Sequence, residues 1–205
     1  MQHVECLTPE RAEQLRAAVK EKYSTVSREP QRGNFAYPVG TESIVRLDYQ
    51  AEWLVDVPSN IAERFVGVGN PFGVRPAKRG ERVLDVGCGC GFDTFVAAAL
   101  VGPEGQAVGL DLTPEMLEIA QTTLAQTKIN NLQFKEGHAE ALPFDDASFD
   151  LVISNGVLNL VPNKEVAFKE IVRVLRPGGD FMAADLVVVE NIPDHLLESM
   201  DAWST

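Results

Sequence analysis

The sequence predicts an α/β fold with a doubly wound, Rossmann-like and mainly parallel sheet covered by helices on both faces. Three observations predict it. From residue 82 onward, short apolar runs alternate with stretches whose apolar residues recur at helical spacing. The first apolar run, at 83–86, ends directly in a glycine-rich turn. The chain has 205 residues, of which 45% are hydrophobic, so one domain can bury its own core.

Five short aliphatic runs are the expected strands of this sheet. They lie at 83–86, 107–112, 132–134, 149–154 and 181–189. The expected helices between them lie at 95–101, 114–124 and 164–175. The second of these helices has the clearest start, because Thr113 suits the N-cap and Pro114 the first helical position. The run Arg176-Pro177-Gly178-Gly179 is expected to end the third helix as a turn.

The first 80 residues differ in composition and hydrophobic pattern from the rest of the chain, and they are expected to form an N-terminal cap of helix and loops. Residues 8–23 look helical, whereas 24–80 are rich in glycine, proline and asparagine. The expected division is therefore a cap at 1–80 that lies on a cofactor-binding domain at 81–205. The N-terminal helix is not expected to reach the functional site.

Charge and hydropathy exclude several classes of partner. The 18 basic and 30 acidic residues give a net charge of −12, which would repel nucleic acid. No apolar run approaches the about 18 residues that a membrane span needs. The N-terminus lacks the order of a signal peptide, so a cytoplasmic location is expected.

The cysteines and histidines predict neither a disulfide framework nor a metal site. Cys6, Cys88 and Cys90 are odd in number, and the last two are spaced too closely for a CxxC motif. Three histidines add no recognisable zinc pattern. We therefore expect no metal.

The strongest chemical signal is the segment VLDVGCGCGFD at 83–93. Gly87 and Gly89 allow a sharp turn that brings backbone N–H groups close to a ligand. The dinucleotide pattern G-x-G-x-x-G is incomplete, because Phe92 stands where the third glycine would be. Asp85 would repel a diphosphate but could pair with the amino group of an amino-acid-like ligand. This favours S-adenosylmethionine (SAM) over NAD, with a plain structural turn as the alternative.

Further candidate residues follow the other strands. Asp111 ends the second strand, where a carboxylate can accept both hydroxyls of a ribose, or else serve the next helix N-terminus. With strand order 3-2-1-4-5, His138 would lie beside an adenine, although a solvent-facing loop histidine is an equal alternative. Asn155 and Gly156 end the fourth strand at the switch point, where ligands bind in such sheets.

Several segments resemble class I SAM-dependent methyltransferases, and more narrowly the arsenite methyltransferase family. The superfamily motifs are VLDVGCGCGFD, VGLDLTPEMLEIA, EGHAEALPFDDASFDLVISNGVLNL and RVLRPGG. The narrower resemblance depends on FAYPVG at 35–40, GVGNPF at 67–72, DLTPEML at 111–117 and SNGVLNLVPNK at 154–164. It covers about residues 20–200 and implies SAM as the cofactor. The negative charge of the chain disfavours RNA, so a small-molecule methyl acceptor is expected.

The resemblance also implies roles for individual residues. Asp85, Gly87 and Gly89 would hold the methionine moiety, Asp111 the ribose, and Asn155 the amino group. Around the adenine and over the cofactor it places, in chain order, Tyr37, Gly69, Asn70, Leu112, Met116, His138 and Ala139.

Two positions depart from the arsenite methyltransferase pattern. Where that family has arsenic-binding cysteines, this chain has Val68 and Gly156, which supply no thiolate. The resemblance therefore keeps SAM but loses the arsenic ligands. Asp93, His138, Asp185 and Tyr37 are candidate general bases, and no spacing singles one out, so the catalytic residues stay undetermined. The alternatives are a non-catalytic SAM-binding or partner module and, third, a nicotinamide-dependent oxidoreductase.

The C-terminal region is expected to lack the hairpin that usually completes such a sheet. Only NIPDHLLESMDAWST follows the fifth strand. An uncovered strand edge favours aggregation, so we expect a fragment, coverage by the cap, or a homodimer.

Overall fold

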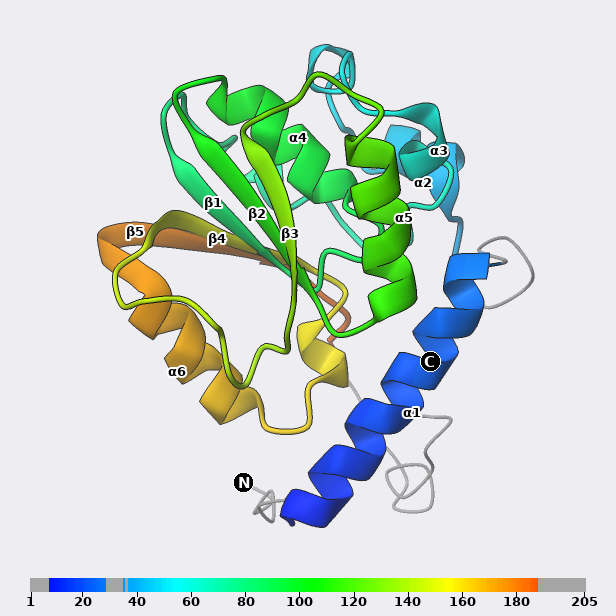
Figure 1. Ribbon diagram of the computed structural model, residues 1–205, viewed down its shortest axis with the longest axis vertical. Helices are drawn as coiled ribbons and strands as arrows, with labels where there is room; N and C mark the ends of the chain where they lie inside the picture. Colours follow the sequence, from blue (N-terminus) through cyan, green and yellow to red (C-terminus); the bar gives the residue numbers. More distant parts are fainter. Residues whose placement is uncertain (1–7, 29–34, 36, 188–205) are drawn as a thin grey trace.

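The computed structural model describes residues 8–28, 35 and 37–187, and it confirms the predicted α/β fold (Figure 1). One sheet contains five parallel strands in the order β3-β2-β1-β4-β5. Their bounds are β1 Arg82–Val86, β2 Gln106–Asp111, β3 Leu132–Glu136, β4 Phe149–Asn155 and β5 Leu175–Ala184. The order reverses between β1 and β4, which places the switch point beside the glycine-rich turn.

Within the described residues, six α-helices and three short 3-10 helices accompany the sheet. The α-helices are α1 Pro9–Arg28, α2 Gly40–Arg46, α3 Ser59–Ala62, α4 Phe92–Val101, α5 Pro114–Leu124 and α6 Lys164–Val174. The 3-10 helices are η1 Ala51–Trp53, η2 Pro71–Gly73 and η3 Leu158–Leu160. None of the helices in the described ranges has the length and apolarity for a membrane span.

Alternation along the strands divides the core into two layers. Val83 of β1 faces the layer that contains α4, whereas Leu84 and Val86 face the layer that contains α6. Buried strands read as nearly continuous aliphatic runs because both faces of the sheet are covered. The view in Figure 1 shows α4 and α5 on one face and α6 on the other.

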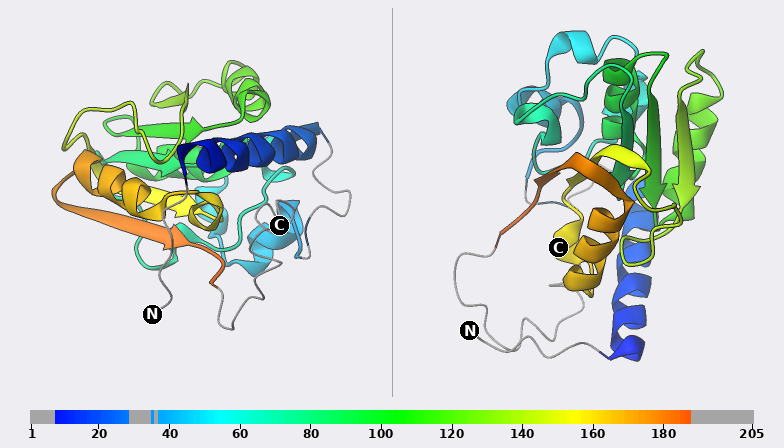
Figure 2. Two further views of the ribbon diagram at one scale, coloured as in Figure 1. Left: turned by 90° about the horizontal axis from the view of Figure 1, so that it is seen from below. Right: turned by 90° about the vertical axis from the view of Figure 1, so that its left-hand side faces the viewer.

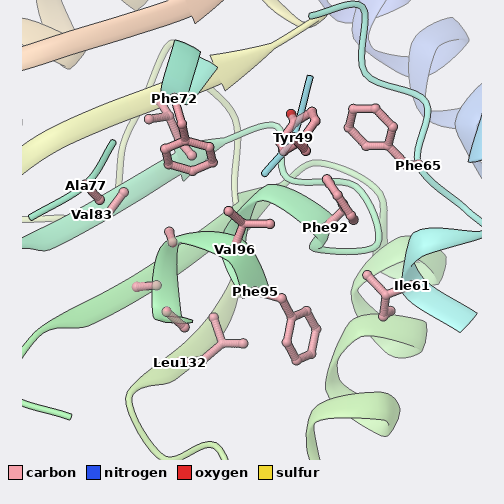
Figure 3. Close-up of a cluster of buried hydrophobic side chains, with 14 of the residues drawn as sticks. Tyr49, Ile61, Phe65, Phe72, Ala77, Val83, Phe92, Phe95, Val96 and Leu132 are labelled. Atoms are coloured by element: carbon pink, nitrogen blue, oxygen red, sulfur yellow. The ribbon is translucent and has the colours of Figure 1, made fainter. Parts of the chain in front are cut away.

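The N-terminal part adds an aromatic cluster to the α4 side of the sheet. Tyr49 packs edge-on against Phe65 and Phe92, with ring centroids 5.6 and 5.1 Å away. Figure 3 shows these three rings together, beside the start of α4. The cap thus shares a core with the sheet.

The start of the fifth strand differs from the prediction. Helix α6 ends at Val174, and the expected turn 176–179 belongs to β5. Leu175 pairs with Phe149 but Asp180 pairs with Leu151, so extra residues are accommodated by a shift of register. The cap also reaches this strand, since Arg75 forms an ion pair of 2.6 Å with Asp180. The strand ends at Ala184, so the prediction is wrong for 185–187, and 188–189 lie outside the described residues.

Helix α1 corrects a second expectation. It lies across the carboxyl ends of the strands and packs against α5 (Figures 1 and 2). Leu15 and Val26 are its fully buried apolar side chains. The N-terminal helix therefore reaches the functional site, because its apolar stripe needs a surface to cover. Cys6 lies outside the described residues.

Candidate functional site

A large cavity opens at the carboxyl ends of β1, β2 and β4, where ligands bind in doubly wound sheets. Its floor is the turn after β1, and its walls come from the loops after β2, β3 and β4. Helix α1 contributes Arg16, Val19 and Tyr23 to the side opposite the sheet. The cavity is therefore enclosed by both the sheet domain and the cap.

The glycine-rich turn is shaped to admit a ligand. Gly87 and Gly89 have φ angles of +78° and +54°, a region that other residues enter at a cost. A Cβ atom on Gly87 would overlap Val157, so the close approach of the next loop requires glycine. At Gly89 a Cβ would meet nothing within 4 Å, which shows open space beside the backbone.

Asp85 lies beneath this turn and is 2% exposed. Its Oδ2 accepts a hydrogen bond of 2.7 Å from the Thr94 hydroxyl. Burial, with the negative charge of nearby Asp93, raises the pKa of Asp85 well above its usual range. A carboxylate in this setting has few partners and would gain from a cationic ligand.

Asp93 belongs to a buried hydrogen-bond network at the same end of the cavity. Its Oδ1 accepts from the Tyr49 hydroxyl at 2.6 Å, and its Oδ2 from the Asn155 amide at 2.9 Å. Burial raises the pKa of Asp93 to about 6, although both hydrogen bonds act in the opposite direction. Burial and the Asp93 charge likewise raise the pKa of Tyr49. These partners hold Asp93 in place but bring no positive charge.

Asn155 joins this network to the cap. Its Oδ1 accepts from the backbone N–H groups of Val68 and Gly69, at 2.9 and 3.1 Å. Its Nδ2 also donates to the Gly69 carbonyl at 2.8 Å. A Cβ on Gly67 would overlap this amide, so the loop approaches β4 closely only because residue 67 is glycine. Asn155 therefore fastens the loop at 67–69 to the sheet.

Asp111 lies at the end of β2, on the opposite side of the turn. Its two oxygens accept backbone hydrogen bonds of 2.8 Å, from Gly89 and from Thr113. Burial raises its pKa, and these backbone donors partly oppose the rise. Thr113 stands at the expected N-cap of α5, but its side chain makes no capping hydrogen bond. The hydrogen bond formed at this position is the one that the Thr113 backbone N–H donates to Asp111.

The loop after β3 lines the cavity beyond Asp111. His138 and Ala139 lie here, and the Nδ1 atom of His138 is buried without a hydrogen-bond partner. Its neighbour Glu140 forms an ion pair of 2.8 Å with Arg16 of α1. This ion pair connects α1 to the loop and helps to close the cavity.

The two described cysteines do not form a reactive pair. Both thiols are free, and the Cys90 Sγ lies 3.2 Å from the Met116 Sδ in the core. Burial raises the pKa of Cys88 and that of Cys90, the latter to about 12. Thiols in this state are poor nucleophiles at neutral pH. Within the described ranges, no group of three or more potential metal ligands occurs.

The structure brings together nine of the twelve residues that the resemblance implied. Those that line the cavity are Asp85, Gly87, Gly89, Asp111, Leu112, Met116, His138, Ala139 and Asn155.

The other three, all from the cap, are not among the residues that line the cavity. Tyr37 donates to the Val66 carbonyl at 3.3 Å, and Asn70 caps η2 by accepting from the Phe72 N–H at 3.0 Å. A Cβ atom on Gly69 would overlap Ala184 of β5, so the cap backbone passes close to that strand.

Sequence reasoning missed Tyr49, Arg64 and Tyr23. Tyr23 and Arg64 line the cavity directly, and Tyr49 reaches it through Asp93. None of them belongs to a motif, and Tyr49 is 44 residues away from its partner in the chain. Asp93 was a candidate base, and the structure shows it as an acceptor inside the network.

Comparisons with known proteins agree with this geometry. Residues 77–205 match a family model described as "Methyltransferase domain". An arsenite methyltransferase of Halobacterium salinarum is 41% identical over 157 residues, which are 77% of this chain and 40% of that protein. A demethylmenaquinone methyltransferase of Lactococcus lactis is 44% identical over 100 residues, 49% of this chain and 40% of that protein. This chain spans less than half the length of these curated relatives.

A solved structure shows the same fold over most of the chain. It is CrArsM of Chlamydomonas reinhardtii, described as an arsenic(III) S-adenosylmethionine methyltransferase. The TM-score is 0.65 and the sequences are 37% identical, with 82% of this chain and 58% of that chain covered.

Proposed function

Because this chain belongs to the class I SAM-dependent methyltransferases, we propose that it transfers a methyl group from SAM to a small-molecule acceptor. The supporting observation is the cavity at the switch point, with three carboxylates around a glycine turn. Asp85, Asp93 and Asp111 form no ion pair with a described cation within 4 Å. A ligand that carries both an ammonium and a sulfonium group complements this charge.

The proposed roles follow the position of each residue in the cavity. Asp85 and the backbone of Gly87 and Gly89 would hold the methionine moiety, and Asp111 the ribose. Leu112, Met116, His138 and Ala139 would surround the adenine. Asn155 would act mainly by fixing Asp93 and the loop at 67–69, because its amide is already hydrogen-bonded there.

The cap and the sheet are proposed to have separate roles: residues 1–80 close the cavity, and residues 81–205 bind the cofactor. SAM supplies an activated methyl group on a positively charged sulfur. The chain's own contribution is to orient the acceptor toward that group and to exclude water. Helix α1, which the ion pair between Arg16 and Glu140 holds in place, would exclude water from the cavity.

The acceptor is proposed to be an organic molecule and not thiol-bound arsenic. Val68 and Gly156 stand where the resemblance places the cysteines of arsenite methyltransferases, and they lie side by side: a Cβ on Gly156 would be 3.3 Å from the Val68 Cγ1. Neither offers a soft ligand. Nearby, Phe65, Val66 and Val157 give the cavity an apolar wall. An acceptor with an apolar body fits this wall.

The predicted cytoplasmic location and homodimer stay predictions.

A turnover assay tests this proposal. Purified protein is incubated with SAM and a panel of phenols, hydroquinones, amines and thiols, with arsenite plus glutathione as a separate arm. We expect release of S-adenosylhomocysteine with at least one organic acceptor and none above background with arsenite. Turnover of arsenite alone would contradict the assignment of the acceptor. SAM binding without turnover on any acceptor would favour the alternative, a non-catalytic SAM-binding module.

A further inference from the structure

Arg64 is a cavity-lining arginine with unused hydrogen-bonding capacity. It follows α3 and lines the cavity beside Phe65 and Val66. Its Nη1 donates to the Asn60 carbonyl at 2.9 Å. Its Nε is buried and has no hydrogen-bond partner among the described residues. A buried guanidinium donor without an acceptor costs free energy, which a bound ligand could recover.

The backbone around Arg64 is held firmly. Asn60, which accepts the Nη1 hydrogen bond, donates through its own amide to the Thr123 hydroxyl at 2.7 Å. This contact fastens α3 to α5. The guanidinium also lies near enough to the turn that its charge opposes the rise in the pKa of the Cys90 thiol. Arg64 is thus fixed close to the floor of the cavity.

Arg64 differs from the other arginine of the cavity in its charge partners. Arg16 also lines the cavity, but ion pairs with Glu13 and Glu140 satisfy it. Arg64 forms no ion pair in the described ranges, and the acidic residues of the floor lie elsewhere in the cavity. A ligand recognised here must therefore present positive groups to the aspartates and one anionic group to Arg64. An α-amino acid has that pattern.

We propose that Arg64 binds the α-carboxylate of the cofactor's methionine moiety, with Nε as one donor. This inference rests on the proposed function, because it requires SAM in this cavity. A guanidinium that presents Nε and a terminal nitrogen can hold a carboxylate with two hydrogen bonds. An acceptor carboxylate would offer the same chemistry, and the experiment distinguishes the two sources.

Calorimetric titration tests the assignment without turnover. S-adenosylhomocysteine and its decarboxylated analogue are titrated into wild type, Arg64→Met and Arg64→Lys. Methionine keeps much of the apolar stem and removes every donor. We expect wild type to prefer the carboxylated ligand by about 10-fold or more. In Arg64→Met this preference falls to within about 3-fold, because only the carboxylated ligand loses affinity. Arg64→Lys, which keeps the charge without the planar fork, is expected to lie between.

A matched control variant shows whether the loss of preference is specific to Arg64. Arg46→Met changes an exposed arginine that is paired with Glu42, and it should keep the wild-type preference. An equal loss for both ligands in Arg64→Met would show a merely structural role and overturn the proposal. If Arg64→Met keeps the preference for the carboxylated ligand, another residue binds the cofactor's carboxylate and the proposal is overturned. Arg64 would then be a candidate to bind a carboxylate of the acceptor. If wild type binds neither ligand, the proposed function itself fails.

Discussion

An Asp85→Asn variant is expected to bind SAM about 10- to 100-fold more weakly than wild type, while its ligand-free fold becomes more stable at neutral pH. The loss of affinity follows from removing a charge-assisted contact to the ligand's ammonium group. The gain in stability follows because a buried charge next to Asp93 disappears. Asparagine can still accept the hydrogen bond from Thr94.

The pH dependence of stability gives a second readout of the same variant. The pKa values of Asp85 and Asp93 are higher in the folded state than in the unfolded chain. At a pH between the unfolded and the folded pKa of either group, the folded state therefore binds more protons than the unfolded state. The stability that these two groups contribute is therefore present at low pH and falls as pH rises, for Asp93 between about 4 and about 6. Asp85→Asn should make this fall smaller.

Thermal unfolding from pH 4 to 8 and calorimetric titration with SAM measure both effects. Asp56→Asn changes an exposed aspartate and serves as the control, with neither property altered. Unchanged affinity in Asp85→Asn would remove its role in binding. A less stable ligand-free variant would contradict the view that the carboxylate is held there at a cost.

An Asn155→Ala variant is expected to lose about 3–5 kcal/mol of unfolding free energy. The substitution leaves the N–H groups of Val68 and Gly69 without their acceptor, and it removes a donor from Asp93. For a domain of this size, the melting temperature should fall by roughly 10 °C. SAM affinity should fall as well, since the loop at 67–69 loses its attachment to β4.

Asn159→Ala is the matched control, because it changes a nearby asparagine in η3. The Oδ1 atom of Asn159 has no hydrogen-bond partner among the described residues, so its loss should have little effect on melting. Differential scanning calorimetry compares the two variants. Equal melting temperatures would show that the Asn155 network does not stabilise the fold.

The sequence predicts those parts of the molecule that depend on local pattern. The strand and turn at Asp85 and Gly87 are read from neighbouring residues, and α5 has its predicted bounds because Pro114 marks its start. Asp111 is recognisable because it directly ends a strand. Local signals of this kind keep their meaning whatever the rest of the chain does.

Contacts between distant segments are harder to predict. The hydrogen bond between Tyr49 and Asp93 and the ion pair between Arg16 and Glu140 join segments that no motif connects. The position of α1 over the cavity depends on such contacts. The register shift in β5 likewise depends on pairing with Phe149 and Leu151, and a glycine pair in the sequence reads equally well as a turn.

The proposed cavity beside Asp85 should recognise a cationic sulfur nucleoside and reject a diphosphate. Calorimetric titration of the wild-type chain with SAM, and in parallel with NADH, distinguishes these two ligand classes. We expect saturable one-to-one binding of SAM and no binding of NADH. Saturable binding of NADH by a protein that gives no heat with SAM would overturn the assignment of the cavity to SAM.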